Sequence, residues 1–284
     1  MVRCLHLVYL LAVYSLLMPA RAAPEPAPRP LRWSWWGELE RISYDEPGVM
    51  QERGVLYGLA AAVEQDIDEL WAWRLEGSWV YGRIDYHGAV VNVLTGEEVR
   101  ADVETPNTIL NARVLAARRF AHDGRSFRPY TGLGYRLLID DLPGDAGYTR
   151  EQTYFYIPIG VEADAWSPSE WKTGFRLEFD WLIRGHNDSR TDVGFVDASV
   201  TQDSGYGLQL AFTILREFAG TGRHNQPLRL TLEPFVQYWD IARSDSDIDD
   251  IALVVDGRVL TGEVTYFEPR NTTDIYGIRA SLEF

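Results

Sequence analysis

The sequence contains one cysteine, one lysine and, beyond Met18, no long apolar run. The cysteine, Cys4, precedes the apolar stretch Leu5 to Met18, so a processed chain would have no disulfide to stabilise it. No later segment offers about eighteen consecutive apolar residues, which argues against a transmembrane helix. The formal net charge of −15 argues against a nucleic-acid partner. The chain must therefore fold by backbone pairing and side-chain packing alone.

The first residues have the order of a secretory signal. Arg3 supplies a positive charge, Leu5 to Met18 an apolar segment, and Ala20-Arg21-Ala22 a small-x-small cleavage site. We therefore expect residues 1–22 to be a signal peptide. Residues 23–31 are rich in proline and alanine and predict an extended lead-in that joins no sheet. Residues 32–284 then form one domain.

Hydrophobicity along this domain has a period of two residues, which is the period of a β-strand. In the segment 171–183 the odd positions are mostly apolar, whereas the even positions include Lys172, Arg176, Glu178 and Asp180. Comparable runs predict ten strands, although counts of eight or twelve remain open. The predicted strands are 32–44, 54–65, 69–87, 103–120, 126–140, 148–165, 170–185, 205–217, 227–242 and 273–284.

The connections between these strands alternate in length. The shorter ones are 66–68, 121–125, 166–169 and 218–226, and the longer ones are 45–53, 88–102, 141–147, 186–204 and 243–272. The last connection contains its own predicted hairpin, in which Ile251–Val255 and Val259–Tyr266 flank the turn Asp256-Gly257-Arg258. We expect this hairpin to project above the membrane as an extension of the barrel wall.

Alternation alone does not say whether the apolar face meets lipid or the interior of a soluble, lipocalin-like barrel. Charges of both signs recur in mid-strand, where they can satisfy one another inside a narrow lumen. They are Glu76, Arg113, Arg128, Arg136, Glu162, Asp164, Arg176, Glu178, Asp180, Arg184, Glu233 and Arg279. Aromatic residues near strand ends fit the girdles of a membrane barrel. They are Trp33, Trp35, Tyr44, Trp71, Trp73, Tyr86, Trp166, Trp171, Tyr238 and Trp239. Both patterns favour lipid.

The last strand carries a resemblance to a known group. Its residues Tyr276, Gly277, Ile278, Ala280, Leu282 and Phe284 resemble the C-terminal assembly signal of Gram-negative outer-membrane β-barrels. The segments 130–136, 156–160 and 234–239 are similar to those of the broad porin-like group, in an uncharacterised subfamily. The resemblance implies an all-β, antiparallel, up-and-down transmembrane barrel with short periplasmic turns and longer external loops. It also implies contact with outer-membrane lipid, lipopolysaccharide and the barrel-assembly machinery, but no particular reaction.

Ten-stranded barrels include the omptins, surface proteases with a pair of aspartates and an Asp-His pair at the external mouth. Such a pair activates water because a carboxylate-oriented imidazole can take its proton. Here His122 and His224 fall in predicted periplasmic turns, and only His87 and His186 reach the outer rim. Their neighbours two residues away are Asp85 and Asp188. Strict alternation from Trp79 and Tyr81 places Asp85 and His87 on the lipid face, unless a bulge near Gly82 intervenes.

Acidic residues also gather in predicted external loops, namely Asp140 and Asp141, and Asp245, Asp247, Asp249 and Asp250. They offer oxygen ligands for calcium or for divalent cations that bridge lipopolysaccharide phosphates. The second group lacks the glycine and terminal glutamate of an EF-hand loop, so a solvated loop is the favoured interpretation. We assign no catalytic residue, no cofactor and no metal site from the sequence.

A ten-stranded barrel encloses little more than its own side chains. We therefore predict a closed or very narrow, charge-filled lumen with acidic external loops, in a structural or surface-binding role whose external ligand is unknown. The alternatives are a narrow selective solute channel and an omptin-like surface hydrolase.

Overall fold

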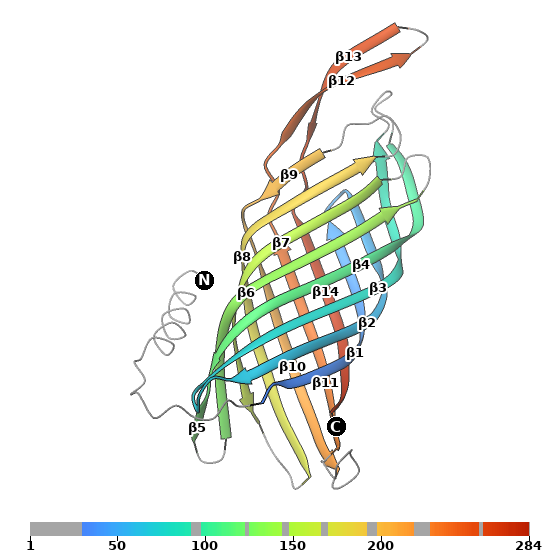
Figure 1. Cartoon of the computed structure of the whole chain (residues 1–284). Coiled ribbons are helices and arrows are strands. Elements are labelled where there is room, and N and C mark those ends of the chain that lie inside the picture. The colour runs from blue at the N-terminus through green and yellow to red at the C-terminus, as the bar shows by residue number, and fades with distance from the viewer. Residues whose placement is uncertain are drawn as a thin grey trace.

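The computed structural model describes residues 30–91, 98–122, 125–143, 148–165, 170–191, 198–218, 228–255 and 258–283. Ten strands close into one antiparallel barrel (Figure 1). They are β1 (Arg32–Glu46), β2 (Met50–Asp66), β3 (Trp71–Val91), β4 (Glu98–Arg118), β6 (Arg125–Leu142), β7 (Tyr148–Asp164), β8 (Trp171–Thr191), β10 (Gly205–Phe218), β11 (Leu228–Ile241) and β14 (Asn271–Glu283). The predicted all-β fold is confirmed. The described residues include no helix that is long and apolar enough to cross a membrane.

Two pairings close the ring. Strand β1 pairs with β2 on one side and with β14 on the other, where Leu39 lies opposite Ile278. Strand β8 pairs with β7 and with β10, where Trp181 lies opposite Tyr206. The start of β1 and the end of β14 lie at one end of the barrel, called the terminal end here, and the opposite end is called the external end (Figure 1).

Two short strands continue the barrel wall. Strand β5 (Phe120–His122) follows β4 and pairs with the start of β6. Strand β9 (Ala198–Gln202) pairs with the external end of β8. After a break at Asp203 and Ser204, β10 pairs with the remainder of β8. The sequence predicted β10 but not β9. Strand β9 has only five residues, and the break separates them from the longer alternating run of β10.

The external connections are shorter than predicted, because the strands run further. The predicted long connection 45–53 is a turn at Pro47–Val49, in which Gly48 has a φ of 81° and the Val49 amide donates to the Glu46 carbonyl at 2.9 Å. Most of the predicted connection 88–102 belongs to β3 and β4, and much of 186–204 belongs to β8 and β9. At the external end the strands of the barrel wall therefore continue beyond the segments in which apolar residues alternate.

The predicted hairpin is present as β12 (Asp247–Val255) and β13 (Arg258–Tyr266). It projects from the external end (Figure 1). It forms its own two-stranded sheet, however, and in the described part of the chain no barrel strand pairs with it. The expected projecting hairpin is therefore present, but as a sheet separate from the barrel strands. Residues 242–246 and 267–270 form the two legs that join it to β11 and β14.

The apolar faces of the strands point outward. Trp35, Leu59 and Trp181 expose 62%, 64% and 52% of their surface, although all three are large and apolar. Exposed apolar residues occur on every side of the barrel, as lipid contact requires. The lipid-facing interpretation is confirmed and the soluble alternative is wrong.

Three predicted girdle residues lie inside instead. Trp33, Trp35 and Trp171 are exposed on the outer face, but Tyr44, Tyr86 and Trp239 are buried. They point inward because they share the strand parity of Ile42, Ile84 and Phe235, which are also buried. The predicted lumen residue Arg184 is exposed on the outer face, because a β-bulge between β7 and β8 shifts the alternation after Leu182. Trp166 lies outside the described residues.

Candidate functional site

The lumen near the terminal end is filled by a network of arginines and glutamates. Arg113 on β4 donates from Nε to Glu76 at 2.5 Å and from Nη1 to Glu178 on β8 at 2.6 Å. Arg128 on β6 reaches Glu64 on β2 at 2.7 Å. Glu76 is on the neighbouring strand β3, but the pairs Arg113–Glu178 and Arg128–Glu64 join strands that are not neighbours, so they tie separate parts of the wall together. Further members are Glu38, Arg74, Glu162, Arg176, Glu233 and Arg279.

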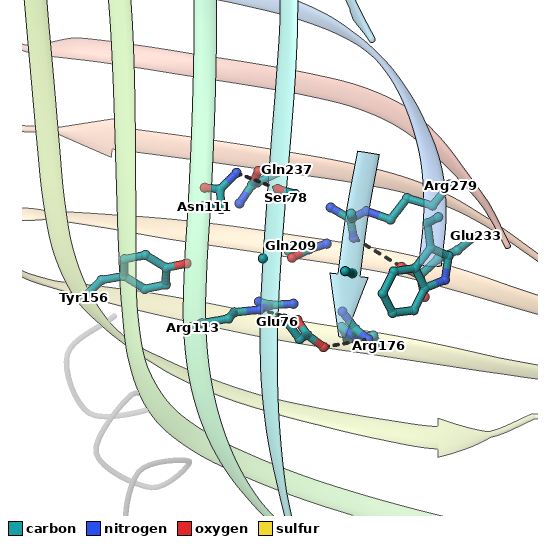
Figure 2. Close-up of a pocket in the computed structure, with 14 residues that line it drawn as sticks. Glu76, Ser78, Asn111, Arg113, Tyr156, Arg176, Gln209, Glu233, Gln237 and Arg279 are labelled. Atoms are coloured by element: carbon teal, nitrogen blue, oxygen red, sulfur yellow. Dashed lines mark hydrogen bonds and ion pairs between the residues drawn. The ribbon is translucent and has the colours of Figure 1, made fainter. Parts of the chain in front are cut away.

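A small polar cavity lies within this network (Figure 2). It has about 70 Å³ of space that a water molecule can reach, and its wall includes Ser78, Asn111, Gln209 and Gln237. Figure 2 shows the Asn111 amide directed at Ser78, to which it donates at 3.1 Å. The space suits a few ordered waters between polar groups but not an organic solute.

An apolar layer crosses the lumen between this network and the external end. Trp239 lies within it, with its ring 6.4 Å from that of Tyr154 and 5.2 Å from that of Tyr156, measured between centroids. The Arg136 guanidinium covers Trp239 at 5.2 Å. Every one of the ten barrel strands contributes to the layer. Its buried members are Ile42, Leu56, Val80, Ile84, Ile109, Leu138, Tyr154, Tyr156, Leu182, Ala211, Phe235, Trp239, Ile241 and Ile275.

Sequence reasoning missed this apolar layer, because it expected charge throughout the lumen. A signal was present in the inward-facing positions of single strands. On β1 these positions change from Glu38 and Glu40 to Ile42, and on β3 they change from Glu76 to Val80 and Ile84. The inward-facing residues of a strand are thus charged near the terminal end and apolar nearer the external end. They alternate throughout with the residues of the outward face.

A second polar group fills the lumen above the layer and is called the outer cluster here. Arg150 on β7 contacts Asp140 at 2.8 Å, Glu46 at 2.5 Å and Glu268 at 3.3 Å, and Glu52 lies at 4.0 Å. These five residues, with Tyr44 and Gln152, make up the cluster. Its four carboxyl groups surround one guanidinium, and all of its members are buried.

Glu268 belongs to this cluster although it lies in a leg of the hairpin rather than in a strand. Its Oε1 accepts hydrogen bonds from Gln152 Nε2 at 2.7 Å and from the Tyr44 hydroxyl at 3.2 Å. Burial raises the pKa of Glu268 to about 8, and the nearby Glu46 carboxylate acts in the same direction, whereas Arg150 opposes the shift. A hairpin leg is thereby fixed inside the barrel mouth.

The two legs are also fixed to each other and to the barrel. The Ser244 amide donates to the Glu268 carbonyl at 3.0 Å, and the Glu268 amide donates to Ser244 Oγ at 2.7 Å. The Asp245 amide donates to the Thr201 carbonyl on β9 at 3.0 Å, and Asp245 Oδ1 accepts from the Thr201 amide at 2.6 Å. The hairpin therefore stands on a hydrogen-bonded base.

The candidate hydrolase residues lie on the outer face in two separate places. His87 Nδ1 is 2.8 Å from Asp102, and both side chains are more than half exposed. On β8, His186 Nε2 is 3.1 Å from Ser199 Oγ and 3.2 Å from Asp188. Because both partners approach the same nitrogen, Asp188 does not orient the far side of the imidazole as a catalytic triad requires.

The predicted register of Asp85 and His87 is confirmed, since β3 pairs with β4 through Gly82 without a shift and both residues face outward. Strands β3 and β8 are not neighbours, so the two histidines do not share a site at the mouth. His122 ends β5, and His224 lies outside the described residues.

The acidic groups are dispersed. Asp140 is buried in the outer cluster, whereas the exposed Asp141 accepts a hydrogen bond from Thr149 at 3.0 Å. Asp245 binds β9, and Asp247 accepts from the Ile248 amide at 3.0 Å. Asp249 and Asp250 are part of β12. Over the described ranges, no three histidine, cysteine, aspartate or glutamate side chains converge on a point that would hold a metal ion.

The predicted assembly signal forms part of β14. Tyr276, Ile278 and Ala280 face outward, whereas the inward-facing Gly277 lies beneath the ring of Phe235. Leu282 pairs with Leu230 across the β11–β14 ladder. Phe284 lies outside the described residues. The outward residues therefore lie on the lipid-facing side of the wall.

No protein-family model matches this sequence, and no curated protein does either. The fold, in contrast, is similar to solved outer-membrane structures. The outer membrane protease OmpT from Escherichia coli matches with a TM-score of 0.56 at 8% identity, over 92% of this chain and 97% of that one. The translocator domain of the autotransporter NalP from Neisseria meningitidis matches with a TM-score of 0.42 at 10% identity, over 99% and 96%.

At such low identity the similarity to OmpT concerns the fold and not the activity. The fold, the outward apolar surface and the salt-bridged interior agree with one another. A closed barrel leaves no unpaired strand edge in the hydrocarbon region of a bilayer, which is the condition for spanning it with strands. The chain is an integral outer-membrane β-barrel in contact with lipid.

Proposed function

We propose that this protein is a non-conducting barrel whose role is structural and surface-binding, with the anchored hairpin as the part that it presents outside the cell. The apolar layer carries this proposal. An ion entering the lumen would have to lose water between closely packed apolar and aromatic side chains, and such layers block conduction. The 70 Å³ cavity below the layer holds waters at most.

Conductance in planar bilayers tests the proposal. We expect the purified protein to give no stable current steps. The double variant Tyr154→Ala, Trp239→Ala removes two large rings from the apolar layer, so it should admit water and produce measurable steps. The control Trp181→Ala removes an outward ring and should stay silent. Stable steps from the unaltered protein would instead support the narrow solute channel.

Two expectations about biogenesis belong to the same proposal. We infer that residues 1–22 are removed and that the C-terminal residues Tyr276 to Phe284 are recognised by the barrel-assembly machinery. N-terminal sequencing of protein from purified outer membranes should begin at Ala23. Removing Phe284 alone should lower the amount of heat-modifiable barrel in that membrane, with Ser281→Ala as the control. An unprocessed N-terminus would contradict the first inference.

A further inference from the structure

Three arginines on neighbouring strands point away from the lumen. Arg41 on β1, Arg53 on β2 and Arg83 on β3 are exposed on the outer face. Within the described part of the chain none of their guanidinium groups has an ion-pair partner, and only Arg53 has a hydrogen bond, from Nε to Ser43 Oγ at 3.3 Å. The arginines of the lumen network, in contrast, are held by carboxylates. The outward row is thus available to a ligand.

The register of the sheet brings the three arginines together. Arg41 lies opposite Val55, and Arg53 is two residues from Val55 on the same strand. Arg53 in turn lies opposite Asp85, two residues from Arg83. Each arginine is therefore a diagonal neighbour of the next, and diagonal neighbours in a sheet are roughly 7–8 Å apart. One headgroup with two phosphates can contact such a row.

The row also lies at a boundary on the outer face. Toward the terminal end the next outward residues are Leu39, Val55 and Tyr81, of which Leu39 and Val55 each expose 51% of their surface. Toward the external end the neighbours are Ser43 and the carboxylates Asp85, Glu104 and Asp274. The row therefore marks the edge of the apolar band, where lipid headgroups meet the barrel wall.

We propose that Arg41, Arg53 and Arg83 bind the phosphates of lipid A in the outer leaflet. Guanidinium groups bind phosphate through paired hydrogen bonds, and they are favoured for this purpose over lysine. The apolar residues directly beneath would contact the acyl chains of the same molecule. Asp85 lies directly opposite Arg53, and Glu104 lies opposite Asp85, so the phosphates compete with Asp85 for Arg53. The inference needs only the membrane placement of the barrel and does not depend on whether the lumen conducts.

Equilibrium binding tests this proposal. The full processed barrel in maltoside micelles is titrated with fluorescent diphosphoryl lipid A, and then with the same lipid after removal of its phosphates. Saturable binding is expected for the first lipid only. The triple variant R41Q/R53Q/R83Q should bind at least about tenfold more weakly, since each basic residue near anionic lipid contributes roughly a fivefold factor.

The matched control is R125Q/R216Q/R229Q, which removes the same charge at the terminal end and should bind as the unaltered protein does. Heat-modifiability on a gel establishes that each variant is folded. If the triple variant does not fold, the three single variants are measured, and each should weaken binding roughly fivefold. The proposal is overturned if the variants bind normally or if the dephosphorylated lipid binds equally well. It is also overturned if millimolar inorganic phosphate displaces the lipid, because that outcome indicates a general anion site.

Discussion

Glu268, from a leg of the hairpin, lies 3.3 Å from Arg150 on the facing wall of the barrel. The contact is buried, and it is the point at which an external appendage enters the lumen. The conformation of the hairpin is therefore coupled to the packing of the barrel interior, and this coupling can be measured.

Replacing Glu268 by alanine should loosen the base of the hairpin. The variant leaves donors of Arg150, Gln152 and Tyr44 without this acceptor, at a cost of roughly 1–3 kcal/mol. We expect faster proteolytic cleavage between β11 and β14, with the barrel itself intact. Glu263→Ala, an exposed carboxylate on β13, is the control. Equal cleavage rates for the two variants would count against the anchoring role.

Stability near the hairpin base should fall as the pH rises. In the folded protein the pKa of Glu268 is raised to about 8 from an ordinary value of 4.5. The folded state therefore binds this proton more tightly, and the resulting stabilisation is complete below about pH 4.5 and is lost as the pH rises through about 8. We expect faster cleavage of the legs at pH 9 than at pH 6, relative to an unfolded substrate. Glu268→Gln should flatten this difference, and an unchanged difference would refute the assignment.

Arg113→Leu should destabilise the barrel strongly. The substitution leaves Glu76 and Glu178 as buried carboxylates without this partner, and breaking a buried pair in this way costs about 3–5 kcal/mol. The midpoint of heat modification should fall, and Arg184→Leu on the outer face should change it little. A small shift for Arg113→Leu would mean that water in the neighbouring cavity solvates the carboxylates.

Gly134→Ala should hinder packing of the lumen. The ring of Tyr156 lies directly over Gly134, so an added methyl group would overlap the ring and push it from the apolar layer. Gly37→Ala is a matched control, because a methyl group there meets nothing within 4 Å. We expect a lower heat-modification midpoint only for Gly134→Ala. Identical midpoints would show that Tyr156 can move without cost.

The strands and the outward face were predictable because both depend on a local pattern. The alternation of Trp171 to Ile183 specified a strand and its two faces without knowledge of its neighbours. The interior of the mouth was not predictable in this way. Trp239 looked like a girdle residue, and nothing near it in the sequence shows that Tyr154 and Tyr156 pack against it. Glu268 enters the outer cluster from a loop, so its partners at positions 44, 46, 150 and 152 become apparent only once the barrel is closed.

The apolar layer takes side chains from all ten barrel strands. Inside the barrel, at the seam between β1 and β14, Arg279 contacts Glu38 at 2.8 Å and Glu233 at 3.2 Å. A chain with nine strands in place has an interior open to water along its whole length. The complete layer and the contact between Arg279 and Glu38 cannot form until the tenth strand is paired. Exclusion of water from the interior therefore requires closure of the wall between β1 and β14.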